Sequence, residues 1–429
     1  MVPKRSSLLY AYYADDFTGS TDVLEALGLH GVKAVLFTHP PEKHELESFP
    51  DCRAIGVAGE SRSRGPEWMT ENLPEIFMRM RGLGSPVNQY KVCSTFDSAP
   101  EVGSIGRAME LGRAAFNSDF VPVVVGAPHL GRAVIFGNLF AAEEGVFYRI
   151  DRHPTMRQHP VTPMKEADLR LHLAKQTKMT MGIVDLIAFQ TCRAGQQLQS
   201  ELAANAEAVV FDGCDDAMLD KTARLLWERA SKRPLFAIAS SGLPYGLLRH
   251  WRRLGLIGEP PQQPRAAAVD RLLVLSGSCS PITAKQIRKA RQQGFAVLHL
   301  ESPGTWGLQT RQALDALAQG QSVVLYTALG PQPMGRKHRE EFGVALGNLL
   351  QELLVASGIR RVVVVGGDTS THAVKQLGID ALTFAAQISP GAPLCICHAK
   401  GSSLDGLELV LKGGQIGPET FFSDVRSGG

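Results

Sequence analysis

The stretch RRVVVVGGDTSTHAVKQLG at 360–378 decides the fold, because it passes from one local structure to another within a few residues. Residues 362–365 are four consecutive valines, an uninterrupted apolar run that is typical of a strand covered on both faces. Gly366 and Gly367 follow, and the pattern after them predicts a helix over 370–378. A buried strand that leads through a glycine turn into a helix is the building unit of a parallel α/β sheet.

The same alternation extends along the whole chain. Strands are predicted at 8–14, 33–38, 54–58, 121–126, 208–212, 235–240, 271–277, 323–327, 360–367 and 394–398. Helices are predicted between them, among others at 20–30, 103–116, 281–293 and 340–357. We therefore expect an α/β protein of two domains with mainly parallel sheets flanked by helices, and an active site in the interdomain cleft.

The domain boundary is predicted from the irregular segment GEPPQQPRAAAVD at 258–270, which is rich in proline and glutamine. It separates an N-terminal domain, 1–257, from a C-terminal domain, 271–422, and residues 423–429 are expected to form a disordered tail. A second irregular stretch, 150–164, is either a linker or a loop that reaches into a site.

Composition narrows the classes of partner. The chain has 429 residues, 44% of them hydrophobic and 20% charged, and a net charge of +3 that favours neither nucleic acid nor an anionic membrane. No apolar run approaches the roughly 18 residues of a membrane helix, and the N-terminus lacks the features of a secretory signal. Seven scattered cysteines are expected to be reduced thiols rather than metal ligands. We expect a cytoplasmic protein.

Three segments of the C-terminal domain have the features of phosphate-binding turns. The first is the turn at Ser276, after which Ser280 and Pro281 mark a helix start. The free amides at a helix start bind anions. The second is Gly366, Gly367, Asp368, Thr369 and Ser370, and the third is the basic glycine loop Lys412, Gly413 and Gly414. Each could instead be an ordinary turn or helix cap, and neither a Walker-type nor a Rossmann glycine pattern is present.

In the N-terminal domain, the segment ADDFTG at 14–19 places two adjacent carboxylates, Asp15 and Asp16, after a predicted strand. The carboxyl end of a strand is where α/β enzymes place their chemistry, and one carboxylate could accept a proton from a substrate hydroxyl. The alternative is that Asp16 or Thr18 simply caps the following helix.

Further candidates follow other strands of this domain. Arg62 is suited to a substrate carboxylate, and Lys91, Ser94, Thr95 and Asp97 form a hydroxyl-rich charged cluster suited to a polyhydroxylated anion. Arg132 and His129 follow the strand at 121–126. The alternative for the cluster is a turn followed by a capped helix.

These motifs, in this order, resemble those of the four-carbon acid sugar kinase family over about 8–422: ADDFTG, Ser61–Arg62, Lys91 with Ser94–Thr95, GGDTS at 366–370 and KGGQIG at 412–417. The resemblance implies an ATP-dependent enzyme, with Mg²⁺, that phosphorylates a hydroxyl of a small sugar acid such as threonate, erythronate or 3-oxo-tetronate. It places Asp15 and Asp16 at the substrate, Arg62 on its carboxylate and Lys91, Ser94 and Thr95 around it. It assigns ATP to Ser276, Gly366, Gly367, Asp368, Thr369 and Gly413.

One segment departs from the family pattern K-x-D-S-T-x-R-G-N. Cys93 stands where that pattern has an acid, and Asp97 stands where it has arginine. The second exchange changes the local charge by about two units, which alters what a pocket accepts. Branched acids such as 3-oxo-isoapionate are therefore candidates. A non-catalytic binding protein or a nucleotide-sugar transferase remains the alternative, and a homo-oligomer remains open.

Overall fold

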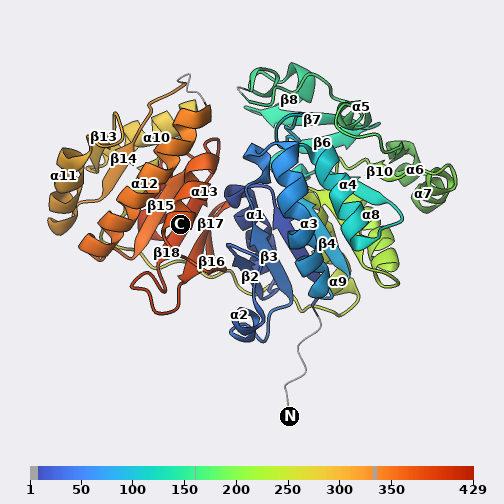
Figure 1. Cartoon of the computed structure of the whole chain (residues 1–429), viewed down its shortest axis with the longest axis horizontal. Coiled ribbons are helices and arrows are strands. Elements are labelled where there is room, and N and C mark those ends of the chain that lie inside the picture. Colours follow the sequence, from blue (N-terminus) through green and yellow to red (C-terminus); the bar gives the residue numbers. More distant parts are fainter. Residues whose placement is uncertain (1–7, 160, 332–335) are drawn as a thin grey trace, which may run out of the picture. The chain divides into compact units, whose positions relative to one another are not determined.

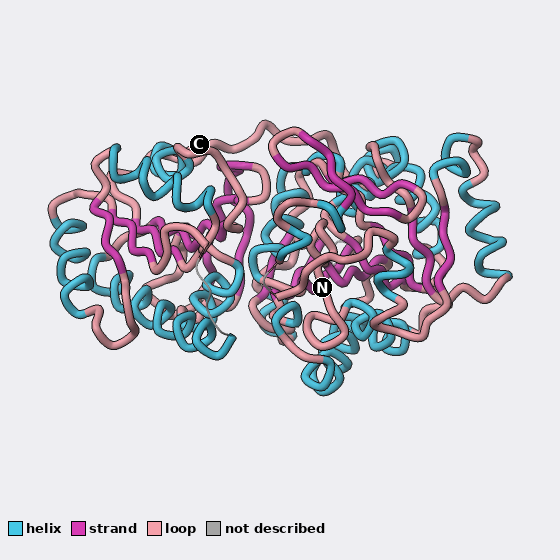
Figure 2. Tube along the Cα trace, turned by 90° about the horizontal axis from the view of Figure 1, so that it is seen from above, coloured by secondary structure: helices cyan, strands magenta, loops and turns pink. Residues whose placement is uncertain are grey.

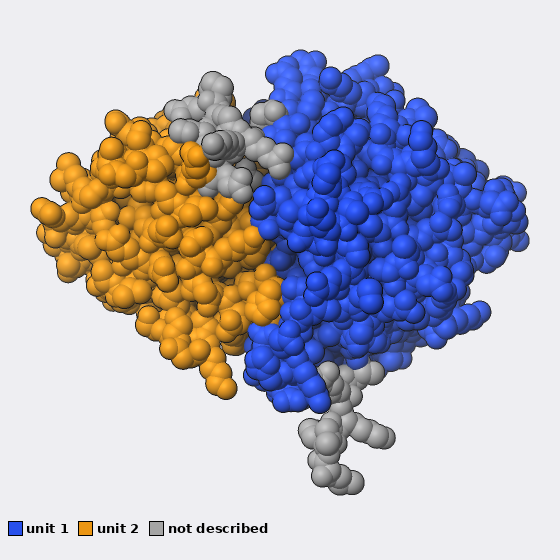
Figure 3. Space-filling model, in the orientation of Figure 1, with its two compact units in different colours: residues 1–15, 30–33, 40–259 blue, residues 16–29, 34–39, 260–429 orange. Residues whose placement is uncertain are grey.

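The computed structural model describes residues 8–159, 161–331 and 336–429, without the side chains of 336–340 and 368. The chain forms two compact units, and both are discontinuous in sequence (Figure 3). Unit 1 comprises residues up to Asp15, His30–Lys33 and Pro40–Glu259, and unit 2 comprises Asp16–Leu29, Ala34–His39 and Pro260–Gly429. The units thus separate inside the predicted linker, but two early segments that were assigned to the N-terminal domain group with the C-terminal one.

Unit 1 is built on a parallel sheet (Figure 1). Its strand order is β3 (Ala54–Ala58), β1 (Tyr10–Ala14), β4 (Val87–Lys91), β11 (Leu235–Ala239), β5 (Val121–Val124), β10 (Ala208–Phe211) and β9 (Met181–Val184). The helices are α2 (Lys43–Glu47), α3 (Pro66–Gly82), α4 (Ile105–Phe116), α5 (Leu169–Leu173), α6 (Leu186–Gln190), α7 (Ala194–Ala203), α8 (Asp216–Ala230) and α9 (Gly242–Arg253). Because β3 and β4 flank β1, the chain continues to both sides of β1, and such a change of direction in strand order is where α/β sheets open a binding crevice.

A small antiparallel sheet interrupts unit 1 after β5. It consists of β6 (Arg132–Ile135), β7 (Asn138–Glu143) and β8 (Val146–Arg149), grouped at one end of the unit in Figure 1. Asp212 fixes its first turn, because its carboxylate accepts the amides of Phe136 at 2.6 Å and Gly137 at 2.8 Å. The irregular stretch 150–164 follows β8 and contains two short 3₁₀ turns, Ile150–Arg152 and Met156–Gln158.

Unit 2 is built on a mixed sheet. The order is β13 (Ala296–His299), β14 (Val323–Tyr326), β12 (Leu273–Ser276), β15 (Arg361–Val365), β18 (Glu408–Lys412), β17 (Ala392–His398), β16 (Ala381–Ser389) and β2 (Ala34–Phe37). The first five strands are parallel, whereas β17, β16 and β2 are added in antiparallel fashion. Helices are α1 (Phe17–Leu29), α10 (Pro281–Gln292), α11 (Gly307–Ala318), α12 (Arg336–Ser357), α13 (Gly367–Gln376) and α14 (Phe421–Ser427). In Figure 2 the strands of each unit lie between helices on both faces.

The α/β class with mainly parallel sheets is confirmed, and each of the ten predicted runs contains a strand. The expected disordered tail at 423–429 is wrong: α14 covers most of it, because Phe421, Phe422 and Val425 are buried against unit 2. Within the described ranges, none of the helices combines the length and apolarity that crossing a bilayer requires.

Candidate active site

The three predicted phosphate-binding segments lie side by side in unit 2. They follow β12, β15 and β18, adjacent parallel strands in which Ser276 is paired with Val365 and Val365 with Lys412. The amide of Gly277 donates to Val365 O at 3.0 Å, and that of Gly366 donates to Lys412 O at 2.9 Å. All three turns therefore emerge together at the carboxyl edge of the sheet, where ligands of α/β proteins bind.

Glycines allow these turns to touch one another. A Cβ atom on Gly277 would lie 2.0 Å from Thr369 Oγ1, and one on Gly414 would lie 2.6 Å from Ser278 Oγ. Gly366, at the start of α13, has φ 113° and ψ 134°, a backbone conformation that only glycine adopts readily. The glycines thus leave space between the turns, lined by small hydroxyl side chains, that a larger side chain would fill.

Three buried hydroxyl groups around this surface have no hydrogen-bond partner among the described residues: Ser276 Oγ, Ser370 Oγ and Thr18 Oγ1. Thr18 belongs with them, because a Cβ on Gly413 would lie 3.7 Å from its methyl group. Unpaired buried hydroxyls are costly, and the oxygens of a phosphate chain are acceptors that would satisfy them. The residues present therefore fit a nucleotide phosphate. Thr18 was considered from the sequence only as a helix cap, although its hydroxyl lies at this surface.

Lys412 was expected to add a positive charge to the third glycine loop, but its side chain lies beneath that loop. It is fully buried, and its Nζ donates to Gly413 O at 3.0 Å and lies 5.5 Å from the centre of the Phe421 ring. This burial lowers the pKa of Lys412 to about 7. The loop above it is anchored by Gln286, whose amide donates to the carbonyls of 416, 417 and 418 at 2.9–3.0 Å. The side chain of Asp368 lies outside the described part of the chain.

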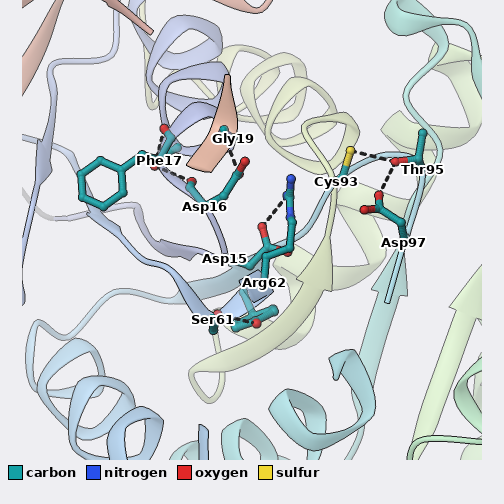
Figure 4. A network of polar contacts seen from close by, with 12 residues as sticks. Asp15, Asp16, Phe17, Gly19, Ser61, Arg62, Cys93, Thr95 and Asp97 are labelled. Atoms are coloured by element: carbon teal, nitrogen blue, oxygen red, sulfur yellow. Dashed lines mark hydrogen bonds and ion pairs between the residues drawn. The ribbon is translucent and has the colours of Figure 1, made fainter. Parts of the chain in front are cut away.

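Asp16 also belongs to unit 2. Its Oδ1 accepts the amide of Gly19 at 2.8 Å, so it caps α1, as the simpler interpretation of the motif expected (Figure 4). Its Oδ2 would lie 3.5 Å from a Cβ on Gly367, the first residue of α13. The carboxylate therefore stands next to the second glycine turn.

Asp15 is placed in unit 1, at the end of β1, and is 4% exposed. Arg62 binds it with two parallel contacts, Nη2 to Oδ1 at 2.6 Å and Nε to Oδ2 at 3.1 Å (Figure 4). Lys91 is brought to the same place, since its carbonyl accepts the Asp15 amide at 3.0 Å. The guanidinium that was expected to clamp a substrate carboxylate is thus already engaged by a carboxylate of the protein.

The polar cluster after β4 is buried around Asp97. Thr95 Oγ1 donates to Asp97 Oδ1 at 2.5 Å and lies 2.9 Å from Cys93 Sγ, and Thr162 Oγ1 donates to Asp97 Oδ2 at 3.4 Å. Burial raises the pKa of Cys93; the Asp97 charge adds to this, and Arg62 and Lys91 oppose it. Ser94, also buried, completes the predicted cluster.

His172 and Gln176, which sequence reasoning missed, form a polar network with Ser98 next to this cluster. Ser98 Oγ lies 2.9 Å from His172 Nε2, and Gln176 Nε2 contacts both, at 2.9 and 3.0 Å. Burial lowers the pKa of His172 to about 4, so the ring is neutral near pH 7. His172 and Gln176 are distant in sequence from 91–98, and no local signal indicated them.

Arg132, at the start of β6, is the second arginine of this region. Its Nη1 donates to Leu130 O, whereas its Nε is buried without a partner among the described residues. Burial lowers the pKa of Arg132, whereas interaction with Cys93 and Glu143 raises it. The guanidinium is therefore close enough to Cys93 to interact with it electrostatically. His153 lies nearby: its Nδ1 is 3.2 and 3.3 Å from two backbone amides and 3.4 Å from Glu143 Oε2. Burial lowers the pKa of His153, and Glu143 opposes this.

A surface cavity of about 350 Å³ lies elsewhere in unit 1, at the amino ends of β5 and β11. None of the predicted site residues lines it. Within the described part of the chain, no group of three or more His, Cys, Asp or Glu side chains could hold a metal ion. A divalent cation here would be held mainly by nucleotide phosphates and water, as Mg²⁺ commonly is.

Comparison with known proteins gives two domain matches, and the first of them includes Asp16 and Thr18, which group with unit 2 in the structure. Residues 10–247 match a sugar-binding N-terminal domain, and residues 273–422 match a nucleotide-binding C-terminal domain. A 3-oxo-isoapionate kinase from Paraburkholderia graminis is 43% identical, covering 99% of this chain and 95% of that protein. A 3-oxo-tetronate kinase from Cupriavidus necator is 32% identical, covering 96% and 95%.

Solved structures give the same fold. One from Salmonella typhimurium LT2 matches with a TM-score of 0.77 and 26% identity, covering 98% of both chains. One from Haemophilus influenzae matches with a TM-score of 0.71 and 23% identity, covering 97% of this chain and 99% of that one. With both domain matches and near-complete alignment to two sugar-acid kinases, the chain belongs to the four-carbon acid sugar kinase family.

Proposed function

We propose that the protein is an ATP-dependent kinase that transfers the γ-phosphoryl group of ATP to a hydroxyl of a small sugar acid. The observation that supports this most directly is the convergence of three glycine turns and three unpaired hydroxyls at the carboxyl edge of β12, β15 and β18. Glycine turns and hydroxyl groups that converge at one edge of a sheet suit a phosphate chain. When bound, ATP supplies the phosphoryl group, and Mg²⁺ neutralises charge on it.

The proposed substrate is a branched 3-oxo acid of the 3-oxo-isoapionate type. The relative with that name is 43% identical, against 32% for the 3-oxo-tetronate kinase from Cupriavidus necator. Asp97 supports this choice. Its carboxylate accepts hydrogen bonds from Thr95 and Thr162, and its remaining lone pairs can accept hydrogen bonds from hydroxyl groups of the substrate.

On the sugar-acid side, we assign the substrate carboxylate to Arg132 rather than to Arg62. Arg132 has a buried Nε with no partner among the described residues, whereas the Arg62 guanidinium is occupied by Asp15. Arg62 then orients Asp15, which accepts the proton of the attacking hydroxyl. Lys91, Ser94 and Thr95 surround the sugar-acid hydroxyls.

On the nucleotide side, Ser276, Thr369, Ser370 and the amides of the glycine turns hold the phosphates. Asp368 lies between Gly367 and Thr369 in the first turn of α13. Buried Lys412 supports the third turn from below through Gly413 O, so its role is to shape the loop. The chemistry requires exclusion of water from the transferring phosphoryl group, as in other phosphoryl transfers.

The test is ADP release from Mg-ATP with a panel of sugar acids: 3-oxo-isoapionate, 3-oxo-tetronate, threonate and erythronate. Turnover is expected, and it should be fastest with 3-oxo-isoapionate. Turnover fastest with 3-oxo-tetronate would keep the kinase and reject the branched substrate. ATP binding without turnover on any acid would reject the proposed acceptor class, and absence of ATP binding would reject the nucleotide site.

A further inference from the structure

The two adjacent aspartates of the ADDFTG motif fall in different compact units. Asp15 ends the first segment of unit 1, and Asp16 begins the first segment of unit 2. Asp15 is bound by Arg62, in the unit that holds the sugar-acid cluster. Asp16 caps α1 and stands beside Gly367, in the unit that holds the nucleotide turns. Asp15 and Asp16 are adjacent in sequence, but Asp15 contacts residues of the sugar-acid cluster and Asp16 lies beside the nucleotide turns.

The place of Asp16 poses an electrostatic problem. Its Oδ2 would lie 3.5 Å from a Cβ on Gly367, so a carboxylate borders a turn built to attract phosphate. Two anions at such a place repel each other unless a cation lies between them. Mg²⁺ is typically bound by one or two carboxylates together with substrate phosphates, which is the combination that this place would offer.

A second observation points the same way. Thr18 Oγ1, in the first turn of α1, is buried without a hydrogen-bond partner in the described structure, and so is Ser370 Oγ, a fully buried atom in the first turn of α13. The two unpaired hydroxyls lie in the first turns of α1 and α13, helices that contact each other and whose starts bring Asp16 next to Gly367. Their oxygen atoms are suited to a hydrated Mg²⁺ ion or to a phosphate bound with it.

We propose that Asp16 is the protein ligand of the Mg²⁺ ion that accompanies the nucleotide, with the Thr18 hydroxyl beside it, while Asp15 serves only the sugar acid. This inference rests on the proposed kinase function and divides the motif into a metal-binding half and a proton-accepting half. It predicts that Asp16 governs the effect of Mg²⁺ on nucleotide binding, in the absence of any sugar acid or turnover.

The test is calorimetric titration of the full-length protein with ADP, in MgCl₂ and in EDTA. For the wild type, Mg²⁺ should tighten ADP binding by at least roughly tenfold, the scale on which single groups tune metal affinity. In Asp16→Asn, this Mg²⁺ effect should disappear, and binding in EDTA should be unchanged or tighter because a negative charge has been removed. Asp15→Asn should keep the full Mg²⁺ effect.

Asparagine retains an oxygen that can accept the Gly19 amide, so the cap of α1 is preserved in Asp16→Asn. Asp16→Ser, which also caps but has no carboxylate, is the second variant, and thermal unfolding checks that both are folded. Retention of the Mg²⁺ effect in either folded Asp16 variant, or its loss in Asp15→Asn, would overturn the inference and leave the kinase proposal standing. A wild type that binds ADP equally in MgCl₂ and EDTA would also overturn it, and a wild type that binds no ADP would overturn both.

Discussion

Gly366→Ala tests the nucleotide turn most directly, because the structure assigns two separate costs to it. The backbone there has φ 113° and ψ 134°, and a non-glycine residue held in such a region costs roughly 1–3 kcal/mol of folding free energy. The added Cβ would also lie 3.3 Å from Thr369 Oγ1 and 3.4 Å from the Ser278 amide, so it would occupy space between two of the turns.

The matched control is Gly378→Ala, after the other end of the same helix. Gly378 has φ 60°, and a Cβ there would meet nothing within 4 Å, so alanine carries only the cost of the left-handed conformation, about 1 kcal/mol. Both variants should therefore unfold at lower urea concentration than the wild type, with Gly366→Ala at least as destabilised as the control.

Nucleotide binding separates the two variants. We expect Gly366→Ala to weaken ADP binding by at least tenfold, which corresponds to about 1.4 kcal/mol, whereas Gly378→Ala should bind like the wild type. Titration calorimetry below the unfolding transition gives both dissociation constants. If Gly366→Ala binds ADP with the wild-type constant, this turn does not hold phosphate and the assignment of the nucleotide site is refuted.

Four further outcomes follow from the described contacts. Asp15→Asn should lower kcat by at least roughly a hundredfold with little change in ADP affinity, and a smaller loss in steady-state assays would exclude it as general base. Arg132→Lys should raise the KM for the sugar acid more than it lowers kcat, because lysine cannot donate two parallel hydrogen bonds to a carboxylate. An unchanged KM would favour Arg62 as the residue that binds the substrate carboxylate. Burial raises the pKa of Glu25 to about 8, so its contribution to stability is complete below pH 4.5 and is lost as pH rises through 8. Urea unfolding from pH 5 to 8 should show a fall in stability, and Glu25→Gln should reduce that fall. Parallel pH profiles for the variant and the wild type would contradict this. The lowered pKa of Lys412 acts in the opposite direction, so stability should fall as pH decreases from 10.5 to 7, and Lys412→Met should remove that slope from the unfolding free energy.

The sequence predicted those features that depend on local pattern. The valines of 362–365 and the glycines that follow predicted a strand and a turn, because period and turn chemistry are local properties. Strands β4 and β18 were missed because their buried faces include polar residues: Asn88, Gln89 and Lys91 in β4, and Lys412 in β18. The antiparallel edge formed by β16 and β17 depends on pairing partners that no local pattern specifies.

The structure gives several candidate residues contacts that the sequence did not suggest. Both acids of ADDFTG were singled out, but their division between two units depends on contacts with Arg62 and Gly367, which are distant in sequence. Arg62 and Lys412 were each expected to present charge to a ligand. One is instead paired with Asp15, and the other is buried beneath its own loop, as only three-dimensional packing could show. The interdomain cleft and the oligomeric state stay predictions.

The discontinuity of unit 2 has a consequence for how the protein is made. Helix α1 and strand β2 leave the ribosome early, but their partners come late: Gly28 packs against Phe384, and Glu25 accepts the Gln387 amide at 3.0 Å. At about 5–20 residues per second, translation of Pro40–Glu259 alone takes on the order of tens of seconds. During that delay the apolar face of α1 lacks its final partners, so chaperones that shield nascent chains should increase the yield of folded protein. A gene fragment encoding 260–429 alone would lack both early elements.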